Sequence, residues 1–304
     1  MQKLTALTSA SSSVPSRRAQ GLLAINVAAV IFGTAALFGK IDVSPVWIVA
    51  MRAAFAAIAL GALALGRGVL RLPEGRLVPS LAGTGVILAL HWVSFFWSVQ
   101  LAGIAVATLT FATFPLFTVF LNAGLHRTRP RALEIAAGLV IVAAVAMLVN
   151  VDIAGSDQRL GAVAGLASAV AFALFGIFSK SLGRDLSPVL VSLYQNTVVA
   201  VVLVPFVALA GSPPRHAADW LWLIVLGIVT TALMHQLYFY ALQRLSPTTC
   251  SGFVALEPVY AIVFAAIFFH EPLTIWVMVS AALILGASVL LLLLDRAAVP
   301  APSL

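Results

Sequence analysis

Long apolar runs without charged residues recur along almost the whole chain, and they constrain its fold more than any other feature. A helix needs roughly 20 mainly apolar residues to cross the hydrocarbon core of a bilayer, and the sequence supplies about ten such runs. The predicted spans are 20–39, 45–66, 78–101, 105–125, 132–150, 160–182, 188–210, 219–242, 248–269 and 273–294. Only 9% of the residues are charged and 62% are hydrophobic, which excludes an ordinary water-soluble domain. We therefore predict an all-α integral membrane protein, because backbone groups that face lipid have to be hydrogen-bonded within each span.

The positive charges indicate how the spans are oriented. If the N-terminus is cytoplasmic, the inner segments carry thirteen Lys and Arg residues, and the outer loops carry three, Lys40, Arg159 and Arg215. Cytoplasmic loops hold an excess of these residues, so we expect both termini in the cytoplasm of a bacterium and the spans in its inner membrane. The net charge of +7 is spread over short loops rather than gathered on one face. This distribution argues against nucleic acid as a partner.

The two halves of the sequence resemble each other in collinear order. Matched residues include Phe32 with Phe172 and Phe38 with Phe178 at an offset of 140, and Ser44-Pro45 with Ser187-Pro188 and Pro115 with Pro258 at an offset of 143. Because each half holds five predicted spans, the second half has to lie upside down in the membrane relative to the first. Inverted repeats are common in secondary transporters, where the substrate site lies between the halves near the bilayer midplane.

This pattern divides the chain into four predicted segments. They are a disordered cytoplasmic tail at 1–18, a first five-helix repeat at 19–150, an inverted second repeat at 151–296 and a C-terminal tail at 297–304. No short apolar core with a small-residue cleavage site precedes the first span, so we expect the N-terminal tail to stay attached.

Three short motifs resemble those of a known family. Phe32 and Phe38-Gly39-Lys40 close the first span, Glu257-Pro258 lies inside the ninth, and His270-Glu271-Pro272-Leu273-Thr274 opens the tenth. Together with ten spans arranged as five plus five, they resemble the EamA-type drug/metabolite transporters over nearly the whole chain. The stretch His91-Trp92-Val93-Ser94-Phe95-Phe96-Trp97 is most similar to the YddG-type amino acid exporters. The resemblance implies a central cavity lined by the first, third, fourth, sixth, eighth and ninth spans.

One departure from internal symmetry accompanies this resemblance. His126-Arg127-Thr128-Arg129-Pro130 stands in the first half where the second half has the acidic His270-Glu271-Pro272. The two halves are therefore not expected to be functionally interchangeable.

Four ionisable side chains fall inside predicted spans: Arg52, His91, His235 and Glu257. Such a residue costs roughly 2.5 to 3.5 kcal/mol at a helix centre, so it usually faces a cavity or a partner. Glu257 is followed by Pro258, which lacks the N–H that would bond the Val254 carbonyl and is expected to kink the helix. Glu257 either binds a substrate ammonium or carries a proton, or it forms a fixed structural pair with Arg52 or a histidine.

The two histidines lie in equivalent spans, each beside aromatic residues. His91, Phe95 and Ser98 share one helix face, as do His235, Tyr238 and Phe239. These six residues and Glu257 are the predicted substrate-binding residues, and the two faces are expected to form one cleft. The alternative is ordinary helix packing, with each histidine bonded to a neighbouring helix.

Pro115 and Pro258 are predicted to bend equivalent helices, either as gating kinks or as static ones. Lys40 and Lys180 are expected to anchor span ends by reaching the interface, or to pair with the nearby Asp42 and Asp185. The sequence holds no Walker loop, HExxH, CxxC or Gly-x-Ser-x-Gly motif, so no cofactor or metal is expected.

We therefore predict a monomeric alternating-access exporter of small amphipathic metabolites, with neutral or aromatic amino acids preferred. Its partners are a small-molecule substrate and the lipid bilayer. In the predicted pose, the substrate ammonium meets Glu257, the carboxylate meets His91, His235 or a helix N-terminus, and the apolar side chain lies on Phe95 and Tyr238. The alternative is an exporter of drug-like or quaternary cations, for which Glu257 and an aromatic cage would suffice. An integral membrane enzyme is the remote alternative.

Overall fold

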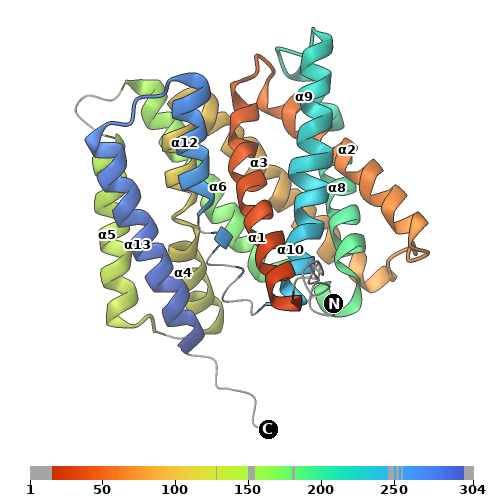
Figure 1. Cartoon of the computed structure of the whole chain (residues 1–304), viewed down its shortest axis with the longest axis horizontal. Coiled ribbons are helices and arrows are strands. Elements are labelled where there is room, and N and C mark those ends of the chain that lie inside the picture. Colours follow the sequence, from red (N-terminus) through yellow and green to blue (C-terminus); the bar gives the residue numbers. More distant parts are fainter. Residues whose placement is uncertain are drawn as a thin grey trace, which may run out of the picture.

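The computed structural model of the chain describes residues 16–127, 129–149, 155–179, 182–245, 250, 253–254 and 256–297. These residues form helices joined by short loops, with no strand in the described part (Figure 1). The helices are α1 (Arg17–Thr34), η1 (Ala35–Lys40), α2 (Pro45–Gly66), η2 (Gly75–Leu77), α3 (Val78–Phe111), α4 (Phe114–His126), α5 (Ala132–Val149), α6 (Ser156–Ser179), α7 (Leu182–Asp185), α8 (Pro188–Leu209), α9 (Ala217–Gly227), η3 (Ile228–Leu233), α10 (Met234–Leu242), α12 (Glu257–Phe269) and α13 (Ile275–Ala297). The predicted all-α class is confirmed. The tail up to residue 15, Lys180 and residues 298–304 lie outside the described residues.

The helices have the length and surface of membrane spans. In the described part, six stretches are long and apolar enough to cross a bilayer: Arg17–Lys40, Pro45–Gly66, Gly75–Phe111, Ser156–Ser179, Pro188–Leu209 and Ala217–Ala241. Shorter apolar helices cover Phe114–Leu125, Ala132–Leu148, Glu257–Phe269 and Ile275–Leu291, within the remaining predicted spans. Large apolar side chains point outward, with Leu23 66%, Ile58 68% and Leu139 67% exposed. A surface of this kind fits lipid, and the chain is a multi-pass membrane protein.

Proline and glycine decide where several helices begin and break. α2 begins at Pro45, behind Ser44, whose side chain accepts a hydrogen bond from the Trp47 N–H, and α8 begins at Pro188 behind Ser187, without a side-chain cap from this serine. Proline suits the first turn because the N–H there has no partner within the helix. Gly103 interrupts α3 with φ 86° and ψ 170°, a conformation that residues with a side chain rarely adopt. This break lies between the predicted spans 78–101 and 105–125 and divides α3 into two helical parts.

Matching elements of the two halves share their local geometry. α4 and α12 are both 13 residues long, and both have a proline in the first turn. Both end at a left-handed residue, Arg127 with φ 52° and His270 with φ 53°. α2 and α8 run antiparallel: Ser44 N donates to Ser212 O at one end of the pair, and Leu60 and Leu190 share a core cluster toward the other.

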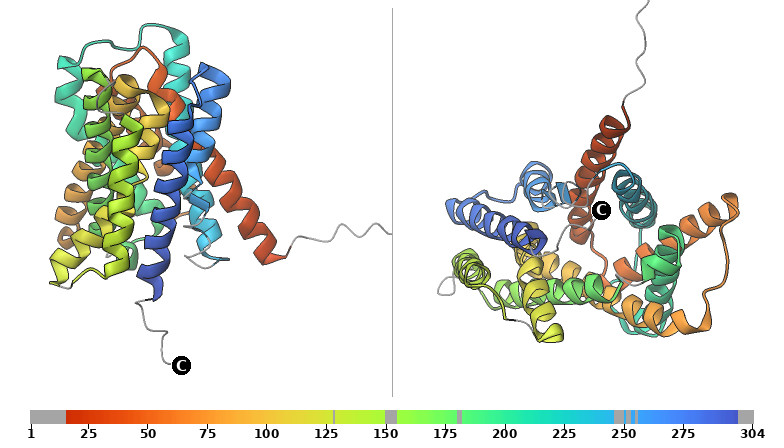
Figure 2. Two further views of the ribbon diagram at one scale, coloured as in Figure 1. Left: turned by 90° about the vertical axis from the view of Figure 1, so that its left-hand side faces the viewer. Right: turned by 90° about the horizontal axis from the view of Figure 1, so that it is seen from below.

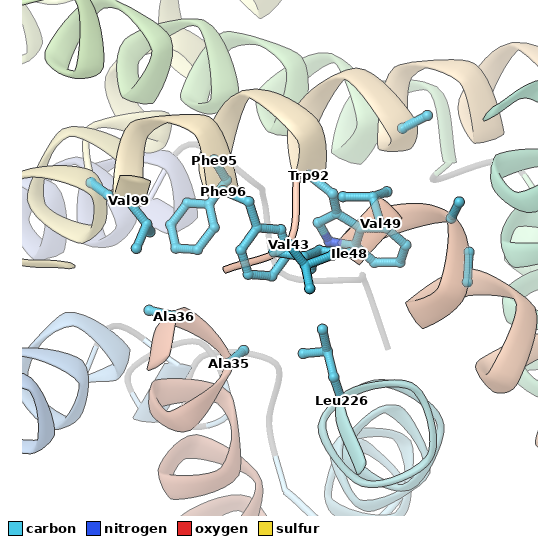
Figure 3. Packing of buried hydrophobic residues seen from close by; sticks show 14 of the residues in the cluster. Ala35, Ala36, Val43, Ile48, Val49, Trp92, Phe95, Phe96, Val99 and Leu226 are labelled. Atoms are coloured by element: carbon cyan, nitrogen blue, oxygen red, sulfur yellow. The ribbon is translucent and has the colours of Figure 1, made fainter. Parts of the chain in front are cut away.

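The helices pack as two groups that meet at one end of the molecule. α3 packs along α6 and α8, while α1 packs against α10 and α12. η1 joins the groups by packing on α3, and Figure 3 shows Ala35 and Ala36 of η1 facing Phe96 and Val99 of α3. The first and last described helices have their free ends on the side opposite η1 (Figures 1 and 2).

Candidate functional site

Arg52 is the charged group around which the intramembrane ionisable residues gather. It lies on α2 and is only 4% exposed. Its charge acts on His91 of α3, His235 of α10 and Glu257 of α12. Residues far apart in the sequence thus form one electrostatic cluster in the interior, in line with the alternative that Glu257 interacts with Arg52 or a histidine.

Thr231 and two aromatic rings hold the Arg52 side chain in place. Arg52 Nε donates a hydrogen bond of 2.7 Å to Thr231 Oγ1. The guanidinium carbon lies 4.1 Å from the centre of the Trp92 ring and 5.9 Å from that of Phe96. Cation–π contacts of this kind strengthen when water is excluded. In the described part of the chain no carboxylate oxygen lies within 4.0 Å of Arg52, so a direct structural ion pair with Glu257 is not formed.

Glu257 begins α12 in a tightly packed corner against α1. It is 6% exposed, and within the described residues nothing donates a hydrogen bond to its carboxylate. Gly33 of α1 makes this contact possible, because a Cβ there would approach the Glu257 carbonyl oxygen to 3.2 Å and Tyr260 Cβ to 2.5 Å. Within the described residues, the Glu257 carboxylate is therefore buried without a hydrogen-bond donor. A buried polar group of this kind is a candidate for binding a ligand.

His91 links α3 to α6. Its Nδ1 lies 2.8 Å from Ser168 Oγ and 3.1 Å from Ser168 O, and Ser168 Oγ donates to the His91 carbonyl oxygen at 3.1 Å. His91 also stacks among Phe111 and Phe172, with ring centroids at 5.1 and 4.9 Å. The interhelical hydrogen bond that the sequence left as an alternative is present, and Nε2 is the ring nitrogen that remains available.

Phe95 and Ser98 lie on the same buried face of α3 as His91. Phe95 is 6% exposed and meets Phe111 at a centroid distance of 5.7 Å. Ser98 is fully buried, and its hydroxyl has no hydrogen-bond partner among the residues that the structure describes. This face packs toward α6 and the start of α4, where Phe114 and Phe172 complete an aromatic cluster.

His235, Tyr238 and Phe239 lie on α10, which packs on α1 instead of α3. His235 Nδ1 lies 2.6 Å from the Thr231 carbonyl oxygen of the preceding turn. Tyr238 packs beside Ala24 and Ile25 of α1. The two predicted faces therefore lie on helices that pack against different neighbours, α3 against α6 and α10 against α1.

A pocket of about 670 Å³ opens beside α10, α1 and the start of α8. Phe239 borders it, together with polar groups that include Gln20, Gln236 and Gln243. The pocket lies toward the chain ends and does not touch Arg52, His91 or Glu257. Its lining includes residues from the beginning of α1, among them Gln20 and Leu23.

Pro115 and Pro258 are both buried in the first turn of their helices. Ala112 and Thr113 form a turn between α3 and α4, so Pro115 lies at the start of a new helix. Both prolines thus lie at helix starts in equivalent positions, and the kink that the sequence predicts at each of them stays a prediction.

The motifs at 38–40 and 270–272 meet at the end of the molecule where η1 packs on α3. Lys40 Nζ lies 2.7 Å from Glu271 Oε1. The Glu271 carboxylate also accepts hydrogen bonds from the backbone N–H of Ile104, at 3.0 and 3.1 Å, and of Ala105, at 3.3 Å. Lys40 therefore pairs with Glu271, which the chain reversal after α12 brings close, and not with Asp42, the alternative to interface anchoring that the sequence offered. Asp185, the predicted partner of Lys180, binds Arg76 at 3.1 Å.

We call Lys40, Glu271 and the Gly103–Ala105 backbone the latch. Gly103 is required here, since a Cβ at this left-handed position would lie 3.1 Å from Glu271 Oε1. The sequence motifs contained both charged residues, but nothing in the sequence indicated that the break at Gly103 would expose N–H groups for Glu271.

Comparisons with known proteins agree with this architecture. A model of the EamA-like transporter family matches the chain twice, at residues 19–150 and 159–293. The chain is 24% identical over 259 residues to the uncharacterized transporter YxxF of Bacillus subtilis, covering 83% of each protein. It is 26% identical over 266 residues to an uncharacterized transporter of Archaeoglobus fulgidus, covering 88% of this chain and 94% of that one. A solved crystal structure with 21% identity has the same fold, with a TM-score of 0.63 over 92% of this chain and 99% of the other.

Proposed function

Because the chain belongs to the EamA-like transporter family, we propose that it is a secondary transporter that exports small amphipathic metabolites, preferably neutral or aromatic amino acids, across the bacterial inner membrane. The coarser conclusion, a membrane transporter, follows from the family. The substrate class, the direction and the mechanism are the proposal. It works as a monomer in the lipid bilayer and needs no cofactor.

The observation that carries the proposal is the cluster around Arg52. Opposite charges and aromatic rings lie together in the interior, where most other buried polar side chains are uncharged. Buried charges without direct partners are costly in a membrane protein and are typical of substrate or ion pathways. An amino acid offers both charges and an apolar side chain, so it complements each kind of group.

In the proposed pose, the substrate ammonium lies at Glu257 and its apolar side chain packs on Phe95 and Tyr238. The histidines are weaker candidates for the carboxylate than the sequence indicated. His91 and His235 both use Nδ1 in hydrogen bonds within the protein, which leaves only their Nε2 atoms. Ser98 and Phe239 contribute to the walls on α3 and α10.

Transport proceeds by alternating access between the two repeats. The latch closes the end of the molecule opposite the chain termini, whereas the pocket beside α10 opens toward the termini. With the termini in the cytoplasm, this arrangement corresponds to an inward-facing state. Movement at Pro115 and Pro258, where helices start at equivalent positions, would open the opposite end.

A drug-like or quaternary cation is the second candidate substrate. The aromatic cluster of Phe95, Phe111, Phe114 and Phe172 and the carboxylate of Glu257 favour it. Arg52 argues against it, because a second positive charge in the same buried cluster repels a cation.

The test is uptake of radiolabelled amino acids into proteoliposomes, with and without an imposed pH gradient. Saturable uptake above that of empty liposomes is expected for the wild-type protein. If Glu257 carries the coupling proton, Glu257→Gln abolishes stimulation by the gradient, because the neutral amide cannot exchange a proton. Glu74→Gln is the matched control, since Glu74 is exposed and pairs only with Arg76. Uptake of quaternary cations but of no amino acid would overturn the proposed substrate class.

A further inference from the structure

Arg52 and Glu257 are two buried charges of opposite sign that interact without touching. Arg52 belongs to the first matched repeat and Glu257 to the second. They are 4% and 6% exposed. The guanidinium of Arg52 packs on Trp92, and Trp92 shares a buried cluster with Ala261, one turn after Glu257 on α12. Among the described residues, no nitrogen of Arg52 lies within 4.0 Å of a carboxylate oxygen. The two charges therefore lie beside the same buried cluster without forming a salt bridge.

The donors of Arg52 are only partly used. Nε donates a hydrogen bond to Thr231. Nη1 and Nη2 donate none to any part of the chain that the structure describes. A guanidinium presents its donors as a planar fork that matches a carboxylate bidentately. The edge of the fork that suits a carboxylate is thus left open.

The surrounding helices hold this fork in a fixed orientation. Thr231 lies in the π-helical η3, where its hydroxyl donates to the Leu226 carbonyl oxygen at 2.9 Å and so presents an oxygen to Arg52. Gly227 lets η3 approach α2, because a Cβ there would lie 2.7 Å from the Arg52 carbonyl oxygen. π-helical turns are rare and frequently occur at functional sites. The face of the guanidinium rests on Trp92.

We infer that Arg52 and Glu257 are the two ends of a zwitterion site, in which the Nη atoms of Arg52 bind the carboxylate of the substrate and Glu257 binds its ammonium. This inference rests on the proposed function and specifies its substrate class as compounds that carry both charges. In this site, Arg52 of the first repeat and Glu257 of the second repeat bind the same substrate molecule. No covalent step is involved.

The energetics of burial favour a zwitterion over an ion of a single charge. A buried charge that lacks a partner is strongly unfavourable, and direct pairing with hydrogen bonds offsets much of that cost. A cation at Glu257 would leave the Arg52 fork open, and an anion at Arg52 would leave Glu257 without a donor. Only a ligand with both charges satisfies the two ends at once.

The test compares three competitors of radiolabelled leucine uptake: unlabelled leucine, leucinamide without a carboxylate, and 4-methylpentanoate without an ammonium. In the wild type, leucine competes about ten- to a hundredfold better than either analogue, the range expected for hydrogen bonds to charged groups. In Arg52→Gln the preference for leucine over leucinamide falls toward one, while the preference over 4-methylpentanoate is retained. Glu257→Gln is expected to give the reverse pattern.

Two further variants separate recognition from folding. Arg215→Gln removes an exposed loop arginine and is expected to leave both preferences unchanged. Thr231→Val removes the acceptor of Arg52 Nε but keeps the charge, and is expected to reduce the preference over leucinamide severalfold while the protein stays monodisperse. It serves as the test if Arg52→Gln does not fold.

The outcomes distinguish this inference from the proposed function. If the wild type transports leucine and folded Arg52→Gln still prefers leucine to leucinamide as strongly, the zwitterion site is wrong and amino acid transport stands. If the wild type takes up no amino acid but takes up quaternary cations, the proposed substrate class fails as well. A merely structural Arg52 would lower the uptake of all substrates together and leave the preferences intact.

Discussion

His91 and Ser168 exchange hydrogen bonds across the contact between α3 and α6. In the sequence, His91 was a predicted substrate ligand with an interhelical bond as its alternative. The structure contains that bond, and the substrate role now depends on Nε2 alone. The two roles are compatible, because the bond through Nδ1 fixes the ring orientation that Nε2 needs.

Removing the Ser168 hydroxyl tests the structural role of His91. Ser168→Ala is expected to destabilise the protein by about 1 kcal/mol, within the range measured for hydrogen bonds between membrane helices. The measurement is the thermal unfolding midpoint in detergent. Ser94→Ala is the matched control, because the Ser94 hydroxyl bonds only carbonyls of its own helix. Equal midpoints for the two variants would argue against the interhelical bond.

Single residues show what the sequence can predict about a site in a membrane. The cost of burying charge identified Arg52, His91, His235 and Glu257, and all four lie in one electrostatic cluster. Their partners did not follow from the sequence, since Arg52 binds Thr231, which is uncharged and 179 positions away. When several membrane helices have similar compositions, the sequence does not indicate which of them pack against each other.

The first and last residues of a helix were predictable where the length of the apolar run sets them. α2 spans Pro45–Gly66, the range predicted from the sequence, and α8 differs from its predicted range by one residue. Interruptions inside a span were not predictable in the same way. The break at Gly103 falls between two predicted spans, but its contact with Glu271 and the π-helical turn of η3 at Thr231 are tertiary features that apolar periodicity does not report.

A glycine pair on α6 explains why α3 and α6 pack so closely. Gly161 and Gly165 are four residues apart on one face of α6. A Cβ at Gly161 would lie 2.5 Å from Ala102 Cβ, and one at Gly165 would collide with Thr110. Small residues at this spacing let membrane helices approach each other. The spacing is visible in the sequence, but similar apolar stretches contain many small residues.

Enlarging Gly161 is expected to separate α6 from α3. Gly161→Leu should lower the free energy of unfolding by about 1 to 3 kcal/mol or more, as overpacking of a close contact does. Gly176→Leu is the matched control on the same helix, since nothing lies within 4 Å of a Cβ at Gly176. Unfolding midpoints in detergent give the comparison. Similar midpoints for both variants would contradict the role assigned to the glycine pair.

The molecule as a whole combines repeated helices with an asymmetric closure. α4 and α12 match in length and in both termini, which reflects the two family matches. The residues after these helices differ: Glu271 follows His270 in the second half, while Thr128 follows Arg127 in the first. Only the second half can therefore supply the acidic group of the latch at this position, a structural difference between halves whose motifs already differ in the sequence.

The latch connects three elements that have to separate if the closed end is to open. Lys40 ends η1, Glu271 follows α12, and the Ile104 and Ala105 N–H groups belong to α3. The carboxylate is 16% and the Lys40 side chain 29% exposed, so the ion pair is only partly screened by water. A charge-assisted contact of this kind contributes about 1.5 to 3 kcal/mol, or at least tenfold in a two-state population.

Glu271→Gln is accordingly expected to shift the protein toward the state that is open at this end. The amide still accepts one hydrogen bond from α3 but loses the ion pair with Lys40. Val99→Cys in a Cys250→Ala background reports the change, because Val99 is fully buried beneath η1. A membrane-impermeant thiol reagent added from this side should label it severalfold faster in Glu271→Gln. Asp42→Asn, which removes an exposed charge at the same end, should leave labelling unchanged. Slow labelling in both variants, with normal transport, would show that the closure is held by apolar packing of η1 on α3 and not by the latch.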